Sequence, residues 1–336
     1  MPAVLARAML GLAAGFYRVA MTLQNCRYDR GWQPASRASV PAVSVGNLTV
    51  GGTGKTPMVE WAARWFRQRG RRVVILSRGY GRTHGLNDEG RVLEENLPDV
   101  PHLQDPDRVR LAGIAVEELE AEVLVLDDGF QHRRLARDLD IVLIDALDPF
   151  GGGRLLPRGL LREPISSLRR AGVVLLSRAD LVSEPDRAAI RTEAERHAGP
   201  LRWAEGRHAP LELLDSELAV SPLSNLPGAR VAAFCGIGNP EGFRRTLLPL
   251  CGALVDFRTF PDHHDYDRSD VESLAGWARD RAVDLVLTTQ KDLVKLRTTH
   301  LGAVPLRALR IGLEITAGGD VLDDAMAGLL SGRPPA

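Results

Sequence analysis

The sequence of 336 residues has no excess of either charge and very little lysine. Lysine plus arginine and aspartate plus glutamate each total 43, so the chain lacks the overall positive field that wrapping a nucleic acid requires. Any site for an anion must therefore be local. Lys55, Lys291 and Lys295 are the only lysines among many arginines, which marks these three positions as candidates for a specific role.

The sequence also lacks paired cysteines and a long uninterrupted apolar run. Its three cysteines are an odd set without CxxC spacing, which argues against a disulfide framework or a zinc site and fits a reducing cytoplasm. Residues 3–23 are apolar, but Arg7 and Arg18 interrupt them, so the segment makes a poor membrane-spanning helix.

Residues 3–23 have a helical pattern nevertheless. Their apolar side chains form one stripe at helical spacing, consisting of Leu5, Met9, Leu12, Phe16, Val19 and Leu23. Arg7, Arg18, Arg27 and Arg30 add positive charge nearby, as in a helix that lies on an anionic membrane surface. A helix that packs on the following domain explains the stripe equally well.

From Pro41 onward, short apolar runs alternate with helical patterns. The runs that we predict to be buried parallel strands are 43–45, 73–76, 123–126, 141–144 and 173–176. Pro57 opens a helix between the first two runs, and Gly70 closes it. This order predicts an α/β fold with a doubly wound, mostly parallel sheet of the P-loop NTPase type.

A second set of elements follows residues 221–227. It consists of a strand at 231–234, a helix after Pro240, and strands near Leu285 and Leu309. We therefore predict three regions: an N-terminal amphipathic, membrane-associating helix (1–30), a P-loop domain (31–222) and a smaller C-terminal α/β domain (223–336).

The strongest motif is SVGNLTVGGTGKT at residues 44–56, between a predicted strand and a predicted helix. That context is the one a phosphate-binding P-loop requires. Its glycines let backbone N–H groups turn toward phosphate oxygens, while Lys55 reaches the β and γ phosphates and Thr56 can ligate magnesium. The predicted nucleotide-binding residues are Thr49, Val50, Gly51, Gly52, Thr53, Gly54, Lys55 and Thr56; Thr49 replaces the first glycine of the usual pattern.

Two adjacent acids, Asp127 and Asp128, end the apolar run at 123–126. A carboxylate at the carboxyl edge of a strand beside a P-loop is where magnesium is usually held. One of the two acids can bind the metal directly and the other through water. Gln131 and His132 follow, and either can orient the nucleotide or pack in a turn.

Several further segments occur together with these motifs. They are SRGYGR at 77–82, DDGFQHRR at 127–134, LLPRGLLREP at 155–164, FPDHH at 260–264 and TTQKD at 288–292. With the P-loop, this ordered set resembles the tetraacyldisaccharide 4'-kinases, the lipid A 4'-kinase family, over nearly the whole chain.

The resemblance implies transfer of the γ-phosphoryl group of ATP to the 4'-hydroxyl of an acylated glucosamine disaccharide 1-phosphate, which gives lipid IVA late in lipid A biosynthesis. It places the protein peripherally on the cytoplasmic face of the inner membrane, with ATP and Mg²⁺ as cofactors; nothing in the sequence indicates a protein partner. Lys55 is catalytic in this scheme. Asp127, Asp128 and Glu163 join Thr56 around the magnesium, and Arg162 faces a phosphate.

The resemblance also implies a catalytic base. The family has an aspartate in a Gly-Asp-Glu-Pro segment, and the nearest match is NDEG at 87–90, so Asp88 is the candidate and Glu89 its neighbour. His263 is its proposed partner across the two domains, with His264 as the alternative. Domain closure would then assemble the site.

Arg78 and Tyr80 are predicted to bind the phosphate or sugar of the substrate. Two other functions remain open. The segment SRAD at 177–180 faintly resembles a guanine-specifying loop, as in a P-loop GTPase or metallochaperone, and a dethiobiotin-synthetase-like ligase can also have a Gly-Lys-Thr loop.

Overall fold

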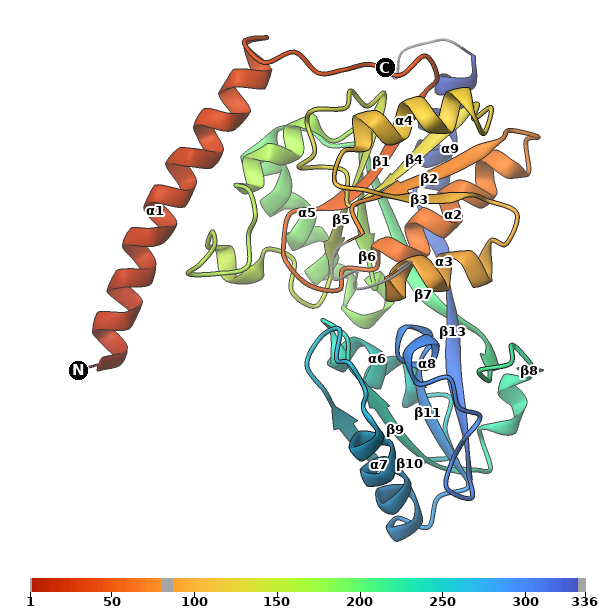
Figure 1. Ribbon diagram of the computed structural model, residues 1–336. Helices are drawn as coiled ribbons and strands as arrows, with labels where there is room; N and C mark the ends of the chain where they lie inside the picture. The colour runs from red at the N-terminus through yellow and green to blue at the C-terminus, as the bar shows by residue number, and fades with distance from the viewer. Residues whose placement is uncertain (1, 80–86, 332–336) are drawn as a thin grey trace. The chain divides into compact units, whose positions relative to one another are not determined.

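The computed structural model describes residues 2–79 and 87–331, which fold into two compact units (Figure 1). The first, here the P-loop unit, comprises Met1–Gly79, Asp99–Arg207 and Ile315–Ala336. The second unit comprises Tyr80–Pro98 and His208–Glu314. Neither unit is a single stretch of chain. The domain boundary predicted between residues 222 and 223 stays a prediction.

The P-loop unit contains a parallel sheet with strand order β7-β6-β5-β1-β4-β2-β3. Its strands are β1 (Ala42–Asn47), β2 (Val73–Ser77), β3 (His102–Gln104), β4 (Val123–Asp127), β5 (Leu139–Asp145), β6 (Val173–Ser177) and β7 (Trp203–Leu214). All five predicted strands of this region are present. The predicted doubly wound α/β fold is confirmed, with β1 inside the sheet between β5 and β4.

Helices connect and flank these strands. They are α1 (Pro2–Asp29), α2 (Lys55–Arg67), α4 (Arg108–Glu117), α5 (Glu184–Ala198) and α9 (Gly319–Leu330), with short 3₁₀ turns at Gly151–Gly153, Ile165–Arg170 and Ala179–Leu181. Helix α2 is the predicted helix between the first two strands, and Gly70 follows its end with a positive φ of 73°. The Trp65 indole N–H of α2 donates to Asp323 of α9 at 2.6 Å, which ties the two helices together.

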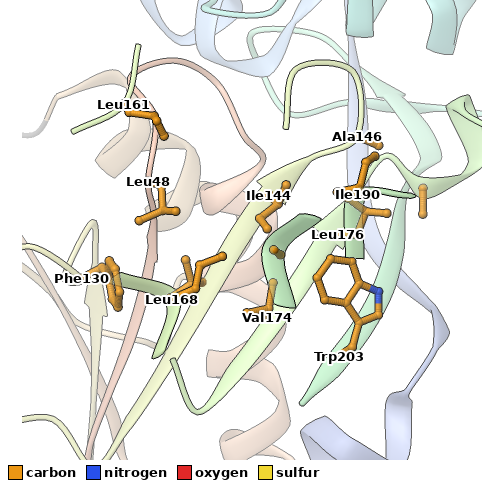
Figure 2. Close-up of a cluster of buried hydrophobic side chains, with 13 residues drawn as sticks. Leu48, Phe130, Ile144, Ala146, Leu161, Leu168, Val174, Leu176, Ile190 and Trp203 are labelled. Atoms are coloured by element: carbon orange, nitrogen blue, oxygen red, sulfur yellow. The ribbon is translucent and has the colours of Figure 1, made fainter. Parts of the chain in front are cut away.

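Two clusters of buried apolar side chains hold the sheet of the P-loop unit to its helices. One of them, shown in Figure 2, joins Phe130, Ile144 of β5 and Leu176 of β6 to Ile190 of α5 and Trp203 of β7. Leu48, next to the P-loop, belongs to the same cluster. The loop therefore starts from a strand end that is fixed by close packing.

The second unit contains another parallel set of strands, in the order β10-β9-β11-β13. Its elements are α3 (Asp88–Asn96), β8 (Val220–Ser221), a 3₁₀ turn at Leu223–Asn225, β9 (Arg230–Cys235), α6 (Pro240–Leu247), β10 (Ala253–Thr259), α7 (Arg268–Asp280), β11 (Leu285–Thr289), α8 (Gln290–Leu296), β12 (His300–Leu301) and β13 (Val304–Ala317). The predicted C-terminal strands and the helix after Pro240 are present.

Helix α3 is the unexpected member of the second unit, because it lies in the sequence between two strands of the P-loop unit. It packs against α8. Gln290 of α8 exchanges hydrogen bonds with the side-chain amide of Asn96 at 3.0 and 3.3 Å. Asp88 therefore lies in the same unit as the histidines of residues 260–264, which differs from the expectation that two domains must close to bring them together.

Candidate active site

The segment between β1 and α2 has the backbone of a phosphate-binding loop. Gly51 and Gly54 have φ values of 118° and 89°, in the region that only glycine adopts without strain. Asn47, the last residue of β1, donates from its side chain to the Thr53 hydroxyl at 2.9 Å and accepts from the Lys55 ammonium at 3.4 Å. Helix α2 begins at Lys55, and no side chain caps its amino end. The first N–H groups of a helix have no partner within the helix and suit an anion.

The start of the loop is fixed by the segment that carries Arg162. The Val50 N–H donates to the Leu160 carbonyl at 2.9 Å, and the Arg162 N–H donates to the Leu48 carbonyl at 2.7 Å. Thr49 forms an isolated β-bridge with Leu161. This pairing brings Arg162 to the carboxyl end of β1.

The two acids at the end of β4 lie beside the P-loop, because Asp127 pairs in register with Val45 of β1. The Asp128 carboxylate accepts two hydrogen bonds from Arg162, at 2.8 and 2.9 Å, and lies 3.6 Å from the Lys55 ammonium. Burial raises the pKa of Asp128, but the charges of Lys55 and Arg162 outweigh it and lower the pKa to about 2. Asp128 is therefore ionised at neutral pH.

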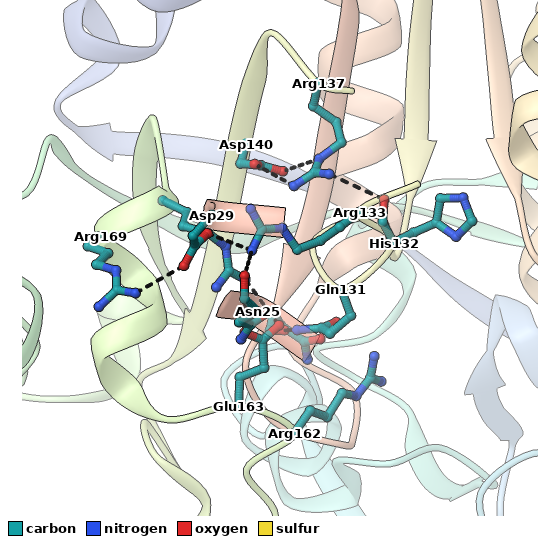
Figure 3. Close-up of polar contacts among 12 residues, drawn as sticks. Asn25, Asp29, Gln131, His132, Arg133, Arg137, Asp140, Arg162, Glu163 and Arg169 are labelled. Carbon is teal, nitrogen blue, oxygen red and sulfur yellow. Dashed lines mark hydrogen bonds and ion pairs between the residues drawn. The ribbon is translucent and has the colours of Figure 1, made fainter. Parts of the chain in front are cut away.

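Glu163 is held differently from the two aspartates, and Figure 3 shows it beside Asn25. Its side chain is 1% exposed and accepts two hydrogen bonds from Arg170, at 3.1 and 2.9 Å, and one from Asn25 of α1 at 2.8 Å. Among the described residues, no group of three or more His, Cys, Asp or Glu side chains is placed to hold a metal. The expected shell of three carboxylates is thus not preformed, because Arg170 and Asn25 engage Glu163.

Helix α1 makes further contacts with the segment that carries Arg162 and Glu163. The Tyr17 hydroxyl donates to the Arg162 carbonyl at 2.9 Å. Asp29, at the end of the helix, accepts from Arg133 at 2.7 Å and lies 3.4 Å from Arg169 (Figure 3). The carboxyl-terminal half of α1 is therefore part of the site, which the amphipathic pattern did not indicate.

Gln131 and His132 lie in the turn after Asp128, where the His132 N–H donates to the Gly129 carbonyl at 2.9 Å. The Gln131 amide donates to the Asn47 carbonyl at 3.0 Å. Burial and the nearby Arg108 lower the pKa of His132 to about 4, so its ring is neutral at physiological pH. Arg108, a buried residue that the sequence did not single out, donates to the Asp128 carbonyl at 3.0 Å. The side chains of Gln131 and Arg108 thus brace the turn that carries Asp128.

The remaining predicted residues of the P-loop unit have less defined surroundings. Thr56 is buried in the first turn of α2. Arg78 is exposed after β2. Tyr80 lies outside the described residues.

In the second unit, Asp88 and His263 are in direct contact. His263 Nδ1 lies 2.9 Å from Asp88 Oδ2, and Lys295 Nζ lies 3.9 Å from the same oxygen. Burial raises the pKa of Asp88, yet the hydrogen bond from His263 and the charge of Lys291 outweigh that effect and lower the pKa to about 2. The same hydrogen bond raises the pKa of His263 against the effect of burial. When His263 is protonated, the two residues form an ion pair in which each stabilises the charge of the other.

The alternatives to this pair have other partners. His264 Nε2 lies 2.8 Å from Asp270, and its ring stacks on Phe260 with centroids 4.8 Å apart. Glu89 accepts from Lys291 at 2.5 Å. The structure therefore pairs His263, and not His264, with Asp88; their catalytic roles stay a prediction.

Asp292 positions the loop that carries His263. Its buried carboxylate accepts from the Gly236 N–H at 3.1 Å, the Tyr266 hydroxyl at 3.0 Å and the Thr289 hydroxyl at 2.6 Å. The His263 N–H in turn donates to the Gly236 carbonyl at 3.2 Å. The scarcity of lysine was a signal for Lys291 and Lys295 beside this centre, whereas no local pattern indicated the role of Asp292.

Comparisons with known proteins point to one family. The family model described as tetraacyldisaccharide-1-P 4'-kinase matches residues 6–327. A tetraacyldisaccharide 4'-kinase of Anaeromyxobacter dehalogenans (strain 2CP-C) is 45% identical over an alignment of 343 residues, which covers 96% of this chain and 90% of that protein. One from Syntrophus aciditrophicus is 39% identical and covers 89% of this chain and 87% of its own.

A solved structure is similar over the same extent. The crystal structure of the "apo" form of LpxK from Aquifex aeolicus, in complex with ATP, superposes with a TM-score of 0.73 at 30% identity. The match covers 96% of this chain and 99% of the Aquifex chain.

Proposed function

The chain belongs to the tetraacyldisaccharide-1-P 4'-kinase family, and from that premise we propose that it transfers the γ-phosphoryl group of ATP to the 4'-hydroxyl of an acylated glucosamine disaccharide 1-phosphate. The acceptor is an alcohol, and the product is lipid IVA. The observation that carries the proposal is the combination of a P-loop with a separate carboxylate and histidine pair. Phosphoryl transfer needs charge neutralisation at the phosphates and a group that accepts the hydroxyl proton.

The residues around the P-loop serve the first need. Asp128 holds the side chains of both Lys55 and Arg162. When a nucleotide binds, its phosphate oxygens would take over part of the contact that these two cations make with Asp128. Asp127, Asp128 and the Thr56 hydroxyl are the donor set for Mg²⁺, which commonly takes one or two carboxylates together with substrate phosphates. The bound ion would neutralise charge that develops on the phosphates. Glu163 then acts through Arg170 and Asn25, next to Arg162.

Asp88 and His263 serve the second need. The pair can take up the proton of the attacking hydroxyl when His263 is neutral, and the product is then the ion pair of aspartate and imidazolium. Lys295, which is 11% exposed and near both Asp88 and Asp292, supports the ionised carboxylates. Arg78 and Tyr80 remain the proposed contacts to the phosphate or sugar.

The exposed face of α1 supports docking on a membrane surface. Met9, Leu12, Phe16, Val19 and Leu23 are 58–77% exposed, so the apolar stripe is not packed on the described parts of the chain. Arg7, Arg18, Arg27 and Arg30 are exposed as well. No helix in the described residues has the length and apolar character needed to cross a bilayer. We place the protein peripherally on the cytoplasmic face of the inner membrane, where the acyl chains of the substrate reside.

The direct test is phosphorylation of a detergent-solubilised tetraacyldisaccharide 1-phosphate. The purified protein should transfer phosphate from ATP to the 4' position, and omission of Mg²⁺ should stop the reaction. GTP should be a poor donor, because the segment at 177–180 resembles a guanine-specifying loop only faintly and has arginine where that loop has lysine. Hydrolysis of GTP without any lipid product would favour the GTPase alternative instead.

A further inference from the structure

The segment that follows β6 contacts the back of the P-loop. The Ser177 hydroxyl donates to the Thr53 carbonyl at 2.7 Å, and Arg178 Nη2 donates to the Gly52 carbonyl at 2.9 Å. Arg178 Nη1 also donates to Asp145, at the end of β5, at 2.5 Å. Ser177, Arg178 and Asp145 are all less than 10% exposed.

The conformation of Arg178 shows that the contact is built with strain. Its φ of 55° lies in the left-handed region, which is costly for a residue with a side chain. The Asp145 carboxylate fixes one edge of the guanidinium and leaves the other edge for the Gly52 carbonyl. A planar fork with several donors suits such a double contact, and a lysine ammonium does not reproduce it.

Holding a carbonyl also fixes the direction of an N–H group, because the two point to opposite sides of a trans peptide. The oxygen of the Thr53–Gly54 peptide is turned toward Ser177, so the Gly54 N–H points to the opposite side of the loop. The Gly52–Thr53 peptide is held by Arg178 at its oxygen and by the Gly51 carbonyl at its N–H, 3.1 Å away. Ser177 and Arg178 thus fix two successive peptide planes of the loop, Gly52–Thr53 and Thr53–Gly54.

We propose that Ser177, Arg178 and Asp145 are positioning residues that fix the backbone of the P-loop so that the Gly54 N–H faces the phosphates of ATP. This assigns a role to the segment at 177–180 that differs from reading a guanine base. The inference rests on the proposed function in one respect, namely that ATP is the ligand of the P-loop. It predicts that the three side chains affect the binding of the β and γ phosphates and leave the rest of the nucleotide unaffected.

The test compares Arg178→Lys and Ser177→Ala with Arg137→Lys, using the full-length protein without lipid acceptor. Arg137 is a matched control, since it forms an equally buried pair with Asp140 in the same unit but contacts no P-loop atom in its hydrogen bonds (Figure 3). The affinities for ATP and AMP are measured by competition with a fluorescent ATP analogue, and the melting temperature is measured alongside.

Arg178→Lys should weaken ATP binding about tenfold or more, the scale of one lost hydrogen bond from a charged donor, and Ser177→Ala should weaken it severalfold. AMP affinity should not change in either variant. Arg137→Lys should lower the melting temperature without changing either affinity. The proposal is overturned if the Ser177 and Arg178 variants bind ATP like the parent, or if AMP binding falls as much as ATP binding. A parent protein that binds no ATP would contradict the proposed function instead.

Discussion

The P-loop and the Asp88–His263 pair differ in the proposed role and in the parts of the chain that form them. The P-loop is one contiguous stretch whose backbone supplies the donors, and the buried side chains of Ser177 and Arg178 hold two of its carbonyls. The pair joins two side chains that are 175 positions apart, and His263 is 46% exposed. At the P-loop several side chains share the work of holding one backbone, whereas a site made of two side chains loses its chemistry with either one.

The difference also lies in charge. Around the P-loop, Asp128 collects two cations, Lys55 and Arg162, that an anionic ligand can share. In the second unit, Lys291 and Lys295 add to the effect of His263 on Asp88. The cations around Asp128 are thus placed to bind phosphate, whereas those around Asp88 keep its carboxylate ionised.

The largest loss of turnover is expected at Asp88 and His263, the two side chains proposed to accept the proton. Asp88→Asn and His263→Ala should each reduce turnover ~10²- to 10⁴-fold, the usual range for a general base. The double variant should be little worse than either single one, because the residues act as a unit. A double-mutant cycle on kcat, with ATP affinity measured beside it, tests this.

His264→Ala is the matched control for that cycle, since its ring contacts Asp270 instead of Asp88. It should keep near-parent turnover. Fully multiplicative losses for Asp88 and His263 would mean that the two residues act independently.

A smaller loss is expected at the P-loop side chain. Lys55→Ala should lower kcat by ~10²- to 10³-fold, the scale of one positioned donor to developing charge, while the fold persists. The stopped assay for lipid phosphorylation measures this. Turnover of Lys55→Ala close to that of the parent would remove the P-loop lysine from the mechanism.

The sequence predicted the P-loop side of the site well, because its signals are local. A strand, a glycine-rich turn and a lysine at a helix start occur within residues 44–56. The position of α3 could not be predicted from sequence in this way, since its packing on α8 depends on partners almost two hundred residues away. The hydrogen bond from Asn25 to Glu163 was missed for the same reason. For Asp88, the resemblance to a family supplied what local pattern could not.

The pH dependence sharpens the contrast between the two centres. The hydrogen bond to Asp88 raises the pKa of His263 above its ordinary value of 6.5, with a small addition from Asp262. The pair accepts a proton only when His263 is neutral, so kcat/KM should rise about tenfold per pH unit up to this raised pKa and then level off. In His263→Gln that limb should disappear from the range above pH 6, because Asp88 alone titrates far lower.

The control for the pH profile is the affinity for ATP, measured over the same range. The pKa of Asp128 is about 2, so this carboxylate of the P-loop centre keeps its charge between pH 6 and 8. An unchanged limb in His263→Gln would assign the titration to another group.

The smallest effect is expected at the contact between α1 and Glu163. Asn25→Leu keeps the approximate size of the side chain but removes the donor to a buried carboxylate, which should cost ~1–3 kcal/mol of stability. Arg170 still holds both oxygens of Glu163, so turnover should fall by no more than about tenfold, as expected for one hydrogen bond. Asp29→Asn is the matched control, because it weakens the attachment of α1 to Arg133 and Arg169 without a hydrogen bond to Glu163. Steady-state turnover and thermal unfolding of both variants decide the matter. If Asp29→Asn lowers turnover as much as Asn25→Leu, turnover depends on the position of α1. If only Asn25→Leu lowers turnover, the amide of Asn25 acts on Glu163 directly.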